Sequence, residues 1–238
     1  MDETGWKQAK KAAWLWVAVT RLVAVFAISR SRSRAAFHDL LGPTPAHIVT
    51  SDRYSAYSHL PAERRQLCWA HLRRDFQAMI DRGGAGRAVG EDLLAQSDVI
   101  LKAWKRVRDG PENREEFCRQ ILPSLRQAFE ETLQRSRACG CAKTSGVCQE
   151  LWRWRESLWN FAHHADVEPT NNAAERAVRH AVCWRKTSYG TASESGSRFV
   201  ERIMTVVASC RLQGRDVLEY VMKSLLAWRE KAPPPSLV

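Results

Sequence analysis

The sequence lacks an uninterrupted apolar run long enough to cross a membrane. Its longest apolar stretch, 12–28, is broken by Thr20 and Arg21 into two short segments, whereas a spanning helix needs about 20 consecutive apolar residues. The chain also lacks the features of a secretory signal. An acidic pair, Asp2 and Glu3, follows the first residue, and no small-residue cleavage site comes after it. We therefore expect no membrane partner.

The cysteines lack the spacing of a disulfide framework or a zinc finger. The seven cysteines are an odd number at irregular spacing in a chain of 238 residues, so reduced thiols in a cytosol are expected. The nearest approach to a metal motif is Cys68-x-x-His71, which has no second pair at ordinary spacing. This pair is either a zinc site or, as we favour, a buried thiol beside a hydrogen-bonded histidine.

Acidic residues are outnumbered by basic ones. The chain has 37 Lys and Arg against 26 Asp and Glu, which gives a net charge of +11. A surplus of this size indicates an anionic partner, most simply nucleic acid. With 45% hydrophobic residues the chain can build a substantial core, and its length fits one large domain or a domain that carries an insertion.

The first 82 residues show strand patterns interrupted by short helices. Two apolar runs, 14–19 and 22–28, are rich in β-branched and aromatic residues and predict a β-hairpin buried on both faces. We expect Trp6, Trp14 and Trp16 to be core residues rather than base-stacking platforms. Further elements are predicted from the same patterns and from the Gly42-Pro43 break: a helix over 35–41, a strand over 48–52, a strand over 66–71 and a helix over 72–80.

Strand signals are absent from the sequence between Gly83 and Val167. Apolar residues recur there at steps of three and four, which is typical of amphipathic helices. Breaks are expected at 110–111 and 139–141, before a helix over 147–161. Beyond this region the patterns predict a polar loop over 184–195, helices over 199–212 and 216–228, and a tail without structure of its own.

Two carboxylates have distinctive local settings. Glu175 follows Pro169 and the residues Thr170-Asn171-Asn172, each of which can cap a helix start. Glu175 is therefore expected in the first helical turn, with Arg179 one turn further along. Asp52 follows the apolar pair Ile48-Val49, so we expect it at the end of a strand.

Four motifs follow one another along the chain: Asp2-Glu3-Thr4-Gly5-Trp6, then Ser51-Asp52-Arg53-Tyr54-Ser55-Ala56-Tyr57, then Leu67-Cys68-Trp69-Ala70-His71-Leu72-Arg73-Arg74, and a block from Pro169 through Ser209-Cys210-Arg211. The last block contains Asn171-Asn172-Ala173-Ala174-Glu175-Arg176 and Trp184-Arg185-Lys186-Thr187-Ser188-Tyr189-Gly190. In content and order, these motifs resemble those of the transposases of the insertion sequence 66 family. The resemblance covers most of the chain.

The resemblance implies an α/β fold, with an RNase H-like mixed sheet flanked by helices and a helical insertion before the last catalytic residue. On this interpretation residues 1–82 form the first part of the core and 83–167 the insertion. Residues 168–230 form the C-terminal helices of the core, and 231–238 a disordered tail.

The resemblance also implies a catalytic triad of Asp2, Asp52 and Glu175 that binds two Mg²⁺ or Mn²⁺ ions. Asp2 would bridge the ions, Asp52 would bind the first and Glu175 the second, with Glu3 as the alternative to Asp2. Hard divalent cations prefer oxygen ligands, and two such ions can stabilise the attacking and leaving oxygens of a displacement at phosphorus. The implied activity is metal-dependent DNA strand cleavage and strand transfer at transposon ends.

The basic residues that flank the motifs are expected to contact phosphates: Arg73, Arg74, Arg176, Arg179, Arg185 and Lys186. Transposon ends and target DNA are the implied partners, and the family pattern allows a homodimer or higher oligomer and an N-terminal DNA-binding segment. The family also places a Cys and His pair such as Cys68 and His71 in a structural element beside the active site. The implied location is the bacterial cytoplasm, in association with the nucleoid.

No helix-turn-helix or zinc-finger signature precedes the core, and we expect the strand that leads to Asp2 to be missing. Asp2 would then lie on a frayed terminus, and strand transfer by this chain alone would be weak. Two alternatives stay open. Instead of a transposase, the chain would then be a catalytically inactive DNA-binding remnant or an RNase H-like nuclease without joining activity.

Overall fold

The computed structural model describes residues 1–237, and Val238 lies outside the described residues. The chain divides into two compact units. Unit 1 comprises residues 1–44, 55–57 and 172–238, and unit 2 comprises 45–54 and 58–171. The fold is mixed α/β, and each unit has its own sheet and its own helices.

Unit 1 is built on a three-stranded antiparallel sheet in the order β1-β2-β3. Its elements are β1 (Asp2–Gln8), β2 (Lys11–Val19), β3 (Ala24–Ser29), α1 (Arg34–Leu41), the short 3₁₀ turn Ser55–Tyr57, α8 (Asn172–Ser188), α9 (Glu194–Leu212) and α10 (Val217–Arg229). The predicted hairpin is confirmed as β2 and β3, although its loop is longer than expected because Val19 pairs with Ala24.

Strand β1 corrects the expected frayed terminus. Asp2 pairs with Val17 of β2, and the register continues to Gln8 opposite Lys11. The polar sequence of β1 gave no strand signal of its own, since its order comes from hydrogen bonding to the apolar strand beside it.

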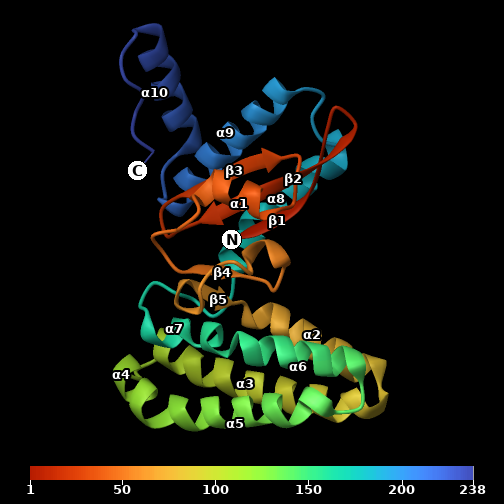
Figure 1. Ribbon diagram of the computed structural model, residues 1–238. Coiled ribbons are helices and arrows are strands. Elements are labelled where there is room, and N and C mark those ends of the chain that lie inside the picture. The colour runs from red at the N-terminus through yellow and green to blue at the C-terminus, as the bar shows by residue number, and fades with distance from the viewer. Residues whose placement is uncertain (238) are drawn as a thin grey trace. The chain divides into compact units, whose positions relative to one another are not determined.

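The two faces of this sheet bury different side chains. Trp6, Leu15 and Phe26 lie on one face and pack with Val178 of α8 and Met204 of α9, and Figure 1 shows α8 and α9 alongside the sheet. Trp16 lies on the other face. There its ring packs edge-on against that of Tyr57, with 6.1 Å between the ring centroids, and Tyr57 packs in the same way against Phe37 of α1 at 5.9 Å. The sheet is therefore covered on both sides within unit 1.

Helix α9 also closes the outer edge of β3. Three of its side chains accept backbone N–H groups of β3: Glu201 from Ile28 at 2.5 Å, Thr205 from Phe26 at 3.0 Å and Ser209 from Ala24 at 3.1 Å. The acceptors recur every four residues, so they lie on one face of the helix. These bonds satisfy donors that an edge strand would otherwise present for association with another chain.

The burial of the early aromatic residues follows the prediction in part. Trp6 and Trp16 are core residues, as expected, whereas Trp14 is half-buried and lies under the guanidinium of Arg32 at 4.8 Å. Val25 of β3 is exposed, so the hairpin is not buried on both faces along its whole length.

Unit 2 combines a two-stranded parallel sheet with a bundle of helices (Figure 1). Its regular elements are β4 (Val49–Ser51), β5 (Arg65–Leu67), α2 (Trp69–Arg82), α3 (Arg87–Asp109), α4 (Arg114–Glu116), α5 (Leu122–Arg135), α6 (Ala142–Arg153) and α7 (Asn160–His163), with short 3₁₀ or π turns at 62–64, 84–86, 117–121, 136–138 and 155–158. The core contains packed aromatic rings. The ring centroid of Trp69 lies 5.0 Å from that of Phe129 and 5.4 Å from that of Trp159.

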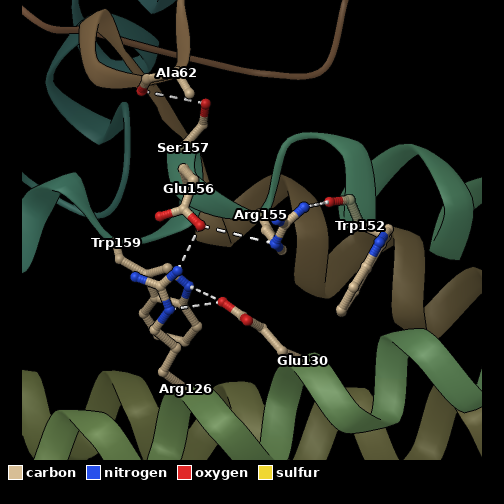
Figure 2. A network of polar contacts seen from close by, with 8 residues as sticks. All are labelled: Ala62, Arg126, Glu130, Trp152, Arg155, Glu156, Ser157 and Trp159. Atoms are coloured by element: carbon tan, nitrogen blue, oxygen red, sulfur yellow. Dashed lines mark hydrogen bonds and ion pairs between the residues drawn. The ribbon is translucent and has the colours of Figure 1, made fainter.

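Polar contacts fix the chain between α6 and α7 against α5 (Figure 2). Arg126 donates to Glu130 at 2.7 Å and to Glu156 at 2.6 Å, while Trp159 donates to Glu130 at 3.2 Å. Because Ser157 donates to the carbonyl of Ala62 at 3.4 Å, the same turn also contacts the segment that leads into β5. The small sheet and the helices of unit 2 thus form one body.

Several predicted elements differ from the observed ones. The segment 147–161 is not one helix, because α6 ends at Arg153 and a 3₁₀ turn precedes α7. The expected loop over 184–195 is wrong in its first part, since α8 continues to Ser188. Helix α2 begins at Trp69, three residues before its predicted start, while the breaks at 110–111 and 139–141 are confirmed.

The five described strands form two sheets rather than one, so the single RNase H-like sheet stays a prediction, as does the division into core and insertion. The described tail residues 232–237 have no helix or strand. Their carbonyl groups nevertheless accept hydrogen bonds, with Pro235 bonded to Tyr220 at 3.0 Å and Ser236 to Arg215 at 3.0 Å. None of the described helices is long and apolar enough to cross a membrane.

Candidate active site

Asp2 lies in β1 on the sheet face that packs against α8. Side chains alternate between the two faces of a strand, so Asp2 shares its face with Thr4 and Trp6, and Trp6 is part of the core formed with α8. Arg185 of α8 donates to the hydroxyl of Thr4 at 3.2 Å and to the carbonyl of Gly5. The fold therefore directs the Asp2 carboxylate toward α8.

Glu175 lies in the first turn of α8, as its capping sequence predicted. Ala174, Val178 and Ala181 of the same helix are buried against the sheet, and Glu175 itself is half-buried. The positive end of the helix dipole favours an anionic side chain at this position. Unit 1 thus brings Asp2 and Glu175 within electrostatic reach of each other.

The pKa of Asp2 is raised to about 6. Burial is the largest cause, because it disfavours the charged form, and the negative charges of Glu3 and Glu175 raise the pKa further. A carboxylate in this state is one that a nearby cation would stabilise, because a cation offsets both the burial of charge and the repulsion.

Glu3 has a different environment from its neighbour Asp2. It points to the opposite face of the sheet, where Arg32 contacts its carboxylate at 2.7 and 2.8 Å and the Tyr57 hydroxyl donates a further hydrogen bond. The Glu3 side chain is only 2% exposed. Its oxygens are engaged by protein donors, so the geometry favours Asp2 over Glu3 as the first acidic residue of the site.

Asp52 belongs to unit 2 and follows β4 directly, in agreement with its predicted place at a strand end. Its carboxylate accepts the backbone N–H of Tyr54 at 2.9 Å, and its carbonyl accepts from Arg65 at 2.9 Å. The next residue, Arg53, forms ion pairs with Asp75 at 2.9 Å and with Glu150. These contacts hold the Asp52 turn in a defined conformation within unit 2.

Three of the motif segments meet at the start of α2. The backbone N–H of Cys68 donates to Ser51, the residue before Asp52, at 2.8 Å. Trp69 donates to the carbonyl of Pro169 at 2.9 Å, and the Cys68 sulfur accepts the backbone N–H of Asn171 at 3.4 Å. Cys68 is buried, as the favoured interpretation requires. Within unit 2, this junction fixes the segment before Asp52 and the segment that ends at Asn171.

The Asp2 and Glu175 carboxylates are donors of a kind that suits a hard divalent cation. No group of three His, Cys, Asp or Glu side chains is positioned to bind a metal within residues 1–237. Asp2 and Glu175 supply oxygen ligands of the kind that Mg²⁺ prefers. The pKa of Asp2 is raised mainly by burial and secondly by the adjacent Glu3, and the charge of Glu175 adds the smallest contribution.

The basic residues near the motifs fall into two groups. Arg185 bonds to β1, and Arg73 forms an ion pair with Asp98 at 2.5 Å, so part of their donor capacity is already engaged. The other residues predicted to bind phosphate have exposed side chains: Arg74, Arg176, Arg179 and Lys186. Phosphate binding by all six residues stays a prediction. The contacts of Glu3 with Arg32 and Tyr57 were missed, because the partners are distant in sequence.

Comparison with known proteins identifies a matching family and several similar proteins. A family model described as "Transposase IS66 family" matches residues 1–198. The uncharacterized protein y4qI of Sinorhizobium fredii is 29% identical over 192 residues, which cover 75% of this chain and 35% of that protein. The uncharacterized protein y4jO of the same organism is 23% identical over 186 residues, with 77% and 53% covered. The chain thus spans between about a third and half of these relatives. No solved structure matches it.

Proposed function

Because the chain belongs to the IS66 family of transposases, we propose that it is a catalytic region that cleaves DNA at transposon ends and transfers the cut strand to target DNA. Asp2, Asp52 and Glu175 are its proposed acidic residues. The observation that carries the proposal is that Asp2 of β1 is a partly buried carboxylate whose pKa is raised to about 6, first by burial, then by Glu3, and to the smallest extent by the charge of Glu175 in α8. Asp52 is proposed from its motif and its position at the end of β4.

The proposed cofactor is a pair of Mg²⁺ or Mn²⁺ ions. Bound divalent ions would supply Lewis-acid stabilisation of the charge that develops on the attacking and leaving oxygens. In this proposal the Asp2 and Glu175 carboxylates are metal ligands, and the hydrogen bond from Tyr54 orients Asp52 for the same role. Water is the proposed nucleophile for cleavage, and the freed 3′ hydroxyl is the nucleophile for joining.

Exposed basic side chains are the proposed contacts to the phosphate backbone. Arg179 lies one helical turn after Glu175 on α8, so a phosphate near the carboxylates would be within the range of a guanidinium on the same helix. The proposed partners are transposon ends and target DNA. A homodimer or higher oligomer is the proposed assembly, as the family resemblance implies.

The test is a nicking and joining assay on supercoiled plasmid with Mn²⁺. Asp2→Asn, Asp52→Asn and Glu175→Gln should each abolish nicking and joining, while Asp39→Asn, which alters an exposed acid of α1, should match the wild type. Nicking without joining would support the nuclease alternative. DNA binding without either reaction in the wild type would support the inactive remnant, and activity retained in the three variants would refute the proposed triad.

A further inference from the structure

Unit 1 has a surface hollow that none of the proposed acidic residues lines. A hollow of about 690 Å³ lies where the β1–β2 turn meets the end of α8. It is lined by Lys7, Ala9, Lys10, Ser188, Tyr189, Gly190, Thr191 and Ala192. The lining includes two lysines and no carboxylate, so it suits an anion.

Thr191 holds this hollow in a fixed shape. Its backbone N–H donates to the carbonyl of Lys7 at 2.9 Å, and its carbonyl accepts from Ala9 at 2.7 Å. Its hydroxyl lies 2.7 Å from the hydroxyl of Ser197 in α9 and accepts from the indole of Trp6 at 3.3 Å. A Cβ at Gly190 would overlap the Lys7 carbonyl oxygen, so the two segments are in close contact.

Tyr189 is displayed in an unusual way on this scaffold. Its φ is 58°, a left-handed conformation that glycine normally adopts at the end of a helix and that disfavours a bulky residue. Its side chain is 77% exposed, so burial of the ring does not offset the strain. An aromatic ring kept in solvent by a strained backbone indicates a binding role.

The charged side chains near Tyr189 in the hollow are lysines that are free to contact a ligand. Lys7, Lys10, Lys11 and Lys186 are exposed, and none of them forms an ion pair with a described residue. Lys10 lies in a two-residue turn with φ 63°, which projects it beyond the end of the hairpin. Lys7 and Lys10, which line the hollow with Tyr189, combine a phosphate-binding surface with a stacking platform.

We propose that this surface binds an unpaired stretch of DNA, with Lys7 and Lys10 on the phosphates and Tyr189 stacked on a base. The inference rests on the proposed function and specifies the DNA structure that unit 1 recognises. Unpaired DNA is favoured because an exposed ring can stack only on a base whose face is open, whereas duplex bases are stacked on one another. Lysine grooves with aromatic platforms are the general means of binding single strands.

The test measures binding by fluorescence anisotropy in the presence of a chelator, so cleavage does not contribute. The probes are a blunt duplex, the same duplex with an unpaired overhang, and a single strand. Tyr189→Ala should weaken binding of the overhang and the single strand about tenfold and alter blunt-duplex binding less than twofold. Tyr189→Phe keeps a ring that can stack and should match the wild type.

Two further variants separate binding from folding. Tyr189→Gly removes the ring and also relieves the left-handed strain, so it should lose affinity as Tyr189→Ala does while its melting temperature rises. Lys7→Gln with Lys10→Gln should reduce the salt dependence of single-strand binding by a slope of about 1.4. The charge-matched control is Lys102→Gln with Lys105→Gln on α3, both exposed, which should leave that slope unchanged.

The outcomes distinguish this inference from the proposed function. Wild-type affinity for the overhang in Tyr189→Ala, or an equal loss in Tyr189→Phe, would overturn the stacking role. Equal effects of the two lysine pairs would overturn the phosphate site. If the wild type bound none of the probes, the proposed function would fail with it. If the Tyr189 and lysine variants lost affinity as expected but Asp2→Asn nicked plasmid at the wild-type rate, the single-strand-binding surface would be supported and the proposed triad would be refuted.

Discussion

The two faces of the β1–β2–β3 sheet give adjacent carboxylates opposite electrostatic environments. On the α8 face, Asp2 is partly buried near Glu175, and its pKa is raised to about 6. On the α1 face, Glu3 is bound by Arg32 and by the Tyr57 hydroxyl. Strand alternation alone separates the two residues. The comparison shows that the α8 face leaves a carboxylate with a raised pKa, while the α1 face neutralises its carboxylate with protein donors. In the proposed function the first carboxylate serves the active site and the second serves stability.

The largest expected effect is on activity. Asp2→Asn should lower plasmid nicking in Mn²⁺ by at least about 100-fold, because it removes a proposed metal ligand and the stabilisation of charge that the metal supplies. Its free energy of unfolding at pH 7 should not fall, since the amide carries no buried charge. The measurement is the initial nicking rate beside urea unfolding of the same preparation. A fully active Asp2→Asn protein would show that the carboxylate on the α8 face has no role in catalysis.

Glu3 should give the converse result, a loss of stability. Glu3→Ala leaves the Arg32 guanidinium and the Tyr57 hydroxyl without their carboxylate in a largely buried setting, and breaking such a pair costs about 3 kcal/mol. Urea unfolding monitored by tryptophan fluorescence measures this loss. Glu63→Gln, an exposed acid, is the control and should change the unfolding free energy by less than about 0.5 kcal/mol. An unaltered stability in Glu3→Ala would contradict the structural role.

Sequence reasoning predicted the elements that are encoded locally. The apolar runs of β2 and β3, the capping residues before α8 and the glycine and proline breaks depend on neighbours within a few residues, and the corresponding elements were found. The predicted helix over 216–228 is found as α10, and Asp216 caps it, because its side chain accepts the N–H of Glu219 at 2.7 Å. The placement of Asp52 after a strand and of Glu175 in a first helical turn followed from the same local signals.

Features that depend on distant partners were missed. Strand β1 is polar and is ordered by β2, and Glu3 meets Arg32 and Tyr57 only after the sheet has formed. The extension of α8 to Ser188 is another case, since Arg185 stabilises it by bonding to β1. In each case the energy that fixes the element comes from tertiary contacts, which a single sequence does not reveal.

The third prediction concerns the pH dependence of stability. The folded pKa of Asp2, about 6, exceeds the ordinary value of about 3.9, so the folded state binds the proton more tightly than the unfolded state. The resulting stabilisation is fully present below about pH 4 and is lost as the pH rises through 6. Between pH 4 and pH 7 the wild type should lose about 2 kcal/mol relative to Asp2→Asn.

Thermal unfolding across this pH range, in a chelator, measures the difference between the two proteins. Added Mn²⁺ at pH 7 should then stabilise the wild type more than the variant, because only the wild type has the carboxylate charge that the cation offsets. Parallel pH profiles for the wild type and Asp2→Asn would show that Asp2 ionises as an ordinary surface residue does.

The smallest effect should come from removing one donor to Glu3. Tyr57→Phe keeps the ring that packs edge-on against Trp16 and Phe37 but deletes the hydroxyl that donates to the Glu3 carboxylate. A hydrogen bond to a charged group contributes about 1.5 kcal/mol, and Arg32 remains to neutralise the charge, so the loss should be about half of that in Glu3→Ala. The double variant Glu3→Ala with Tyr57→Phe should be less destabilised than the sum of the single losses, because the two residues share one interaction. Additive losses in this cycle would show that the hydroxyl and the carboxylate act independently, and the α1 face would then owe its stability to packing rather than to the Glu3 network.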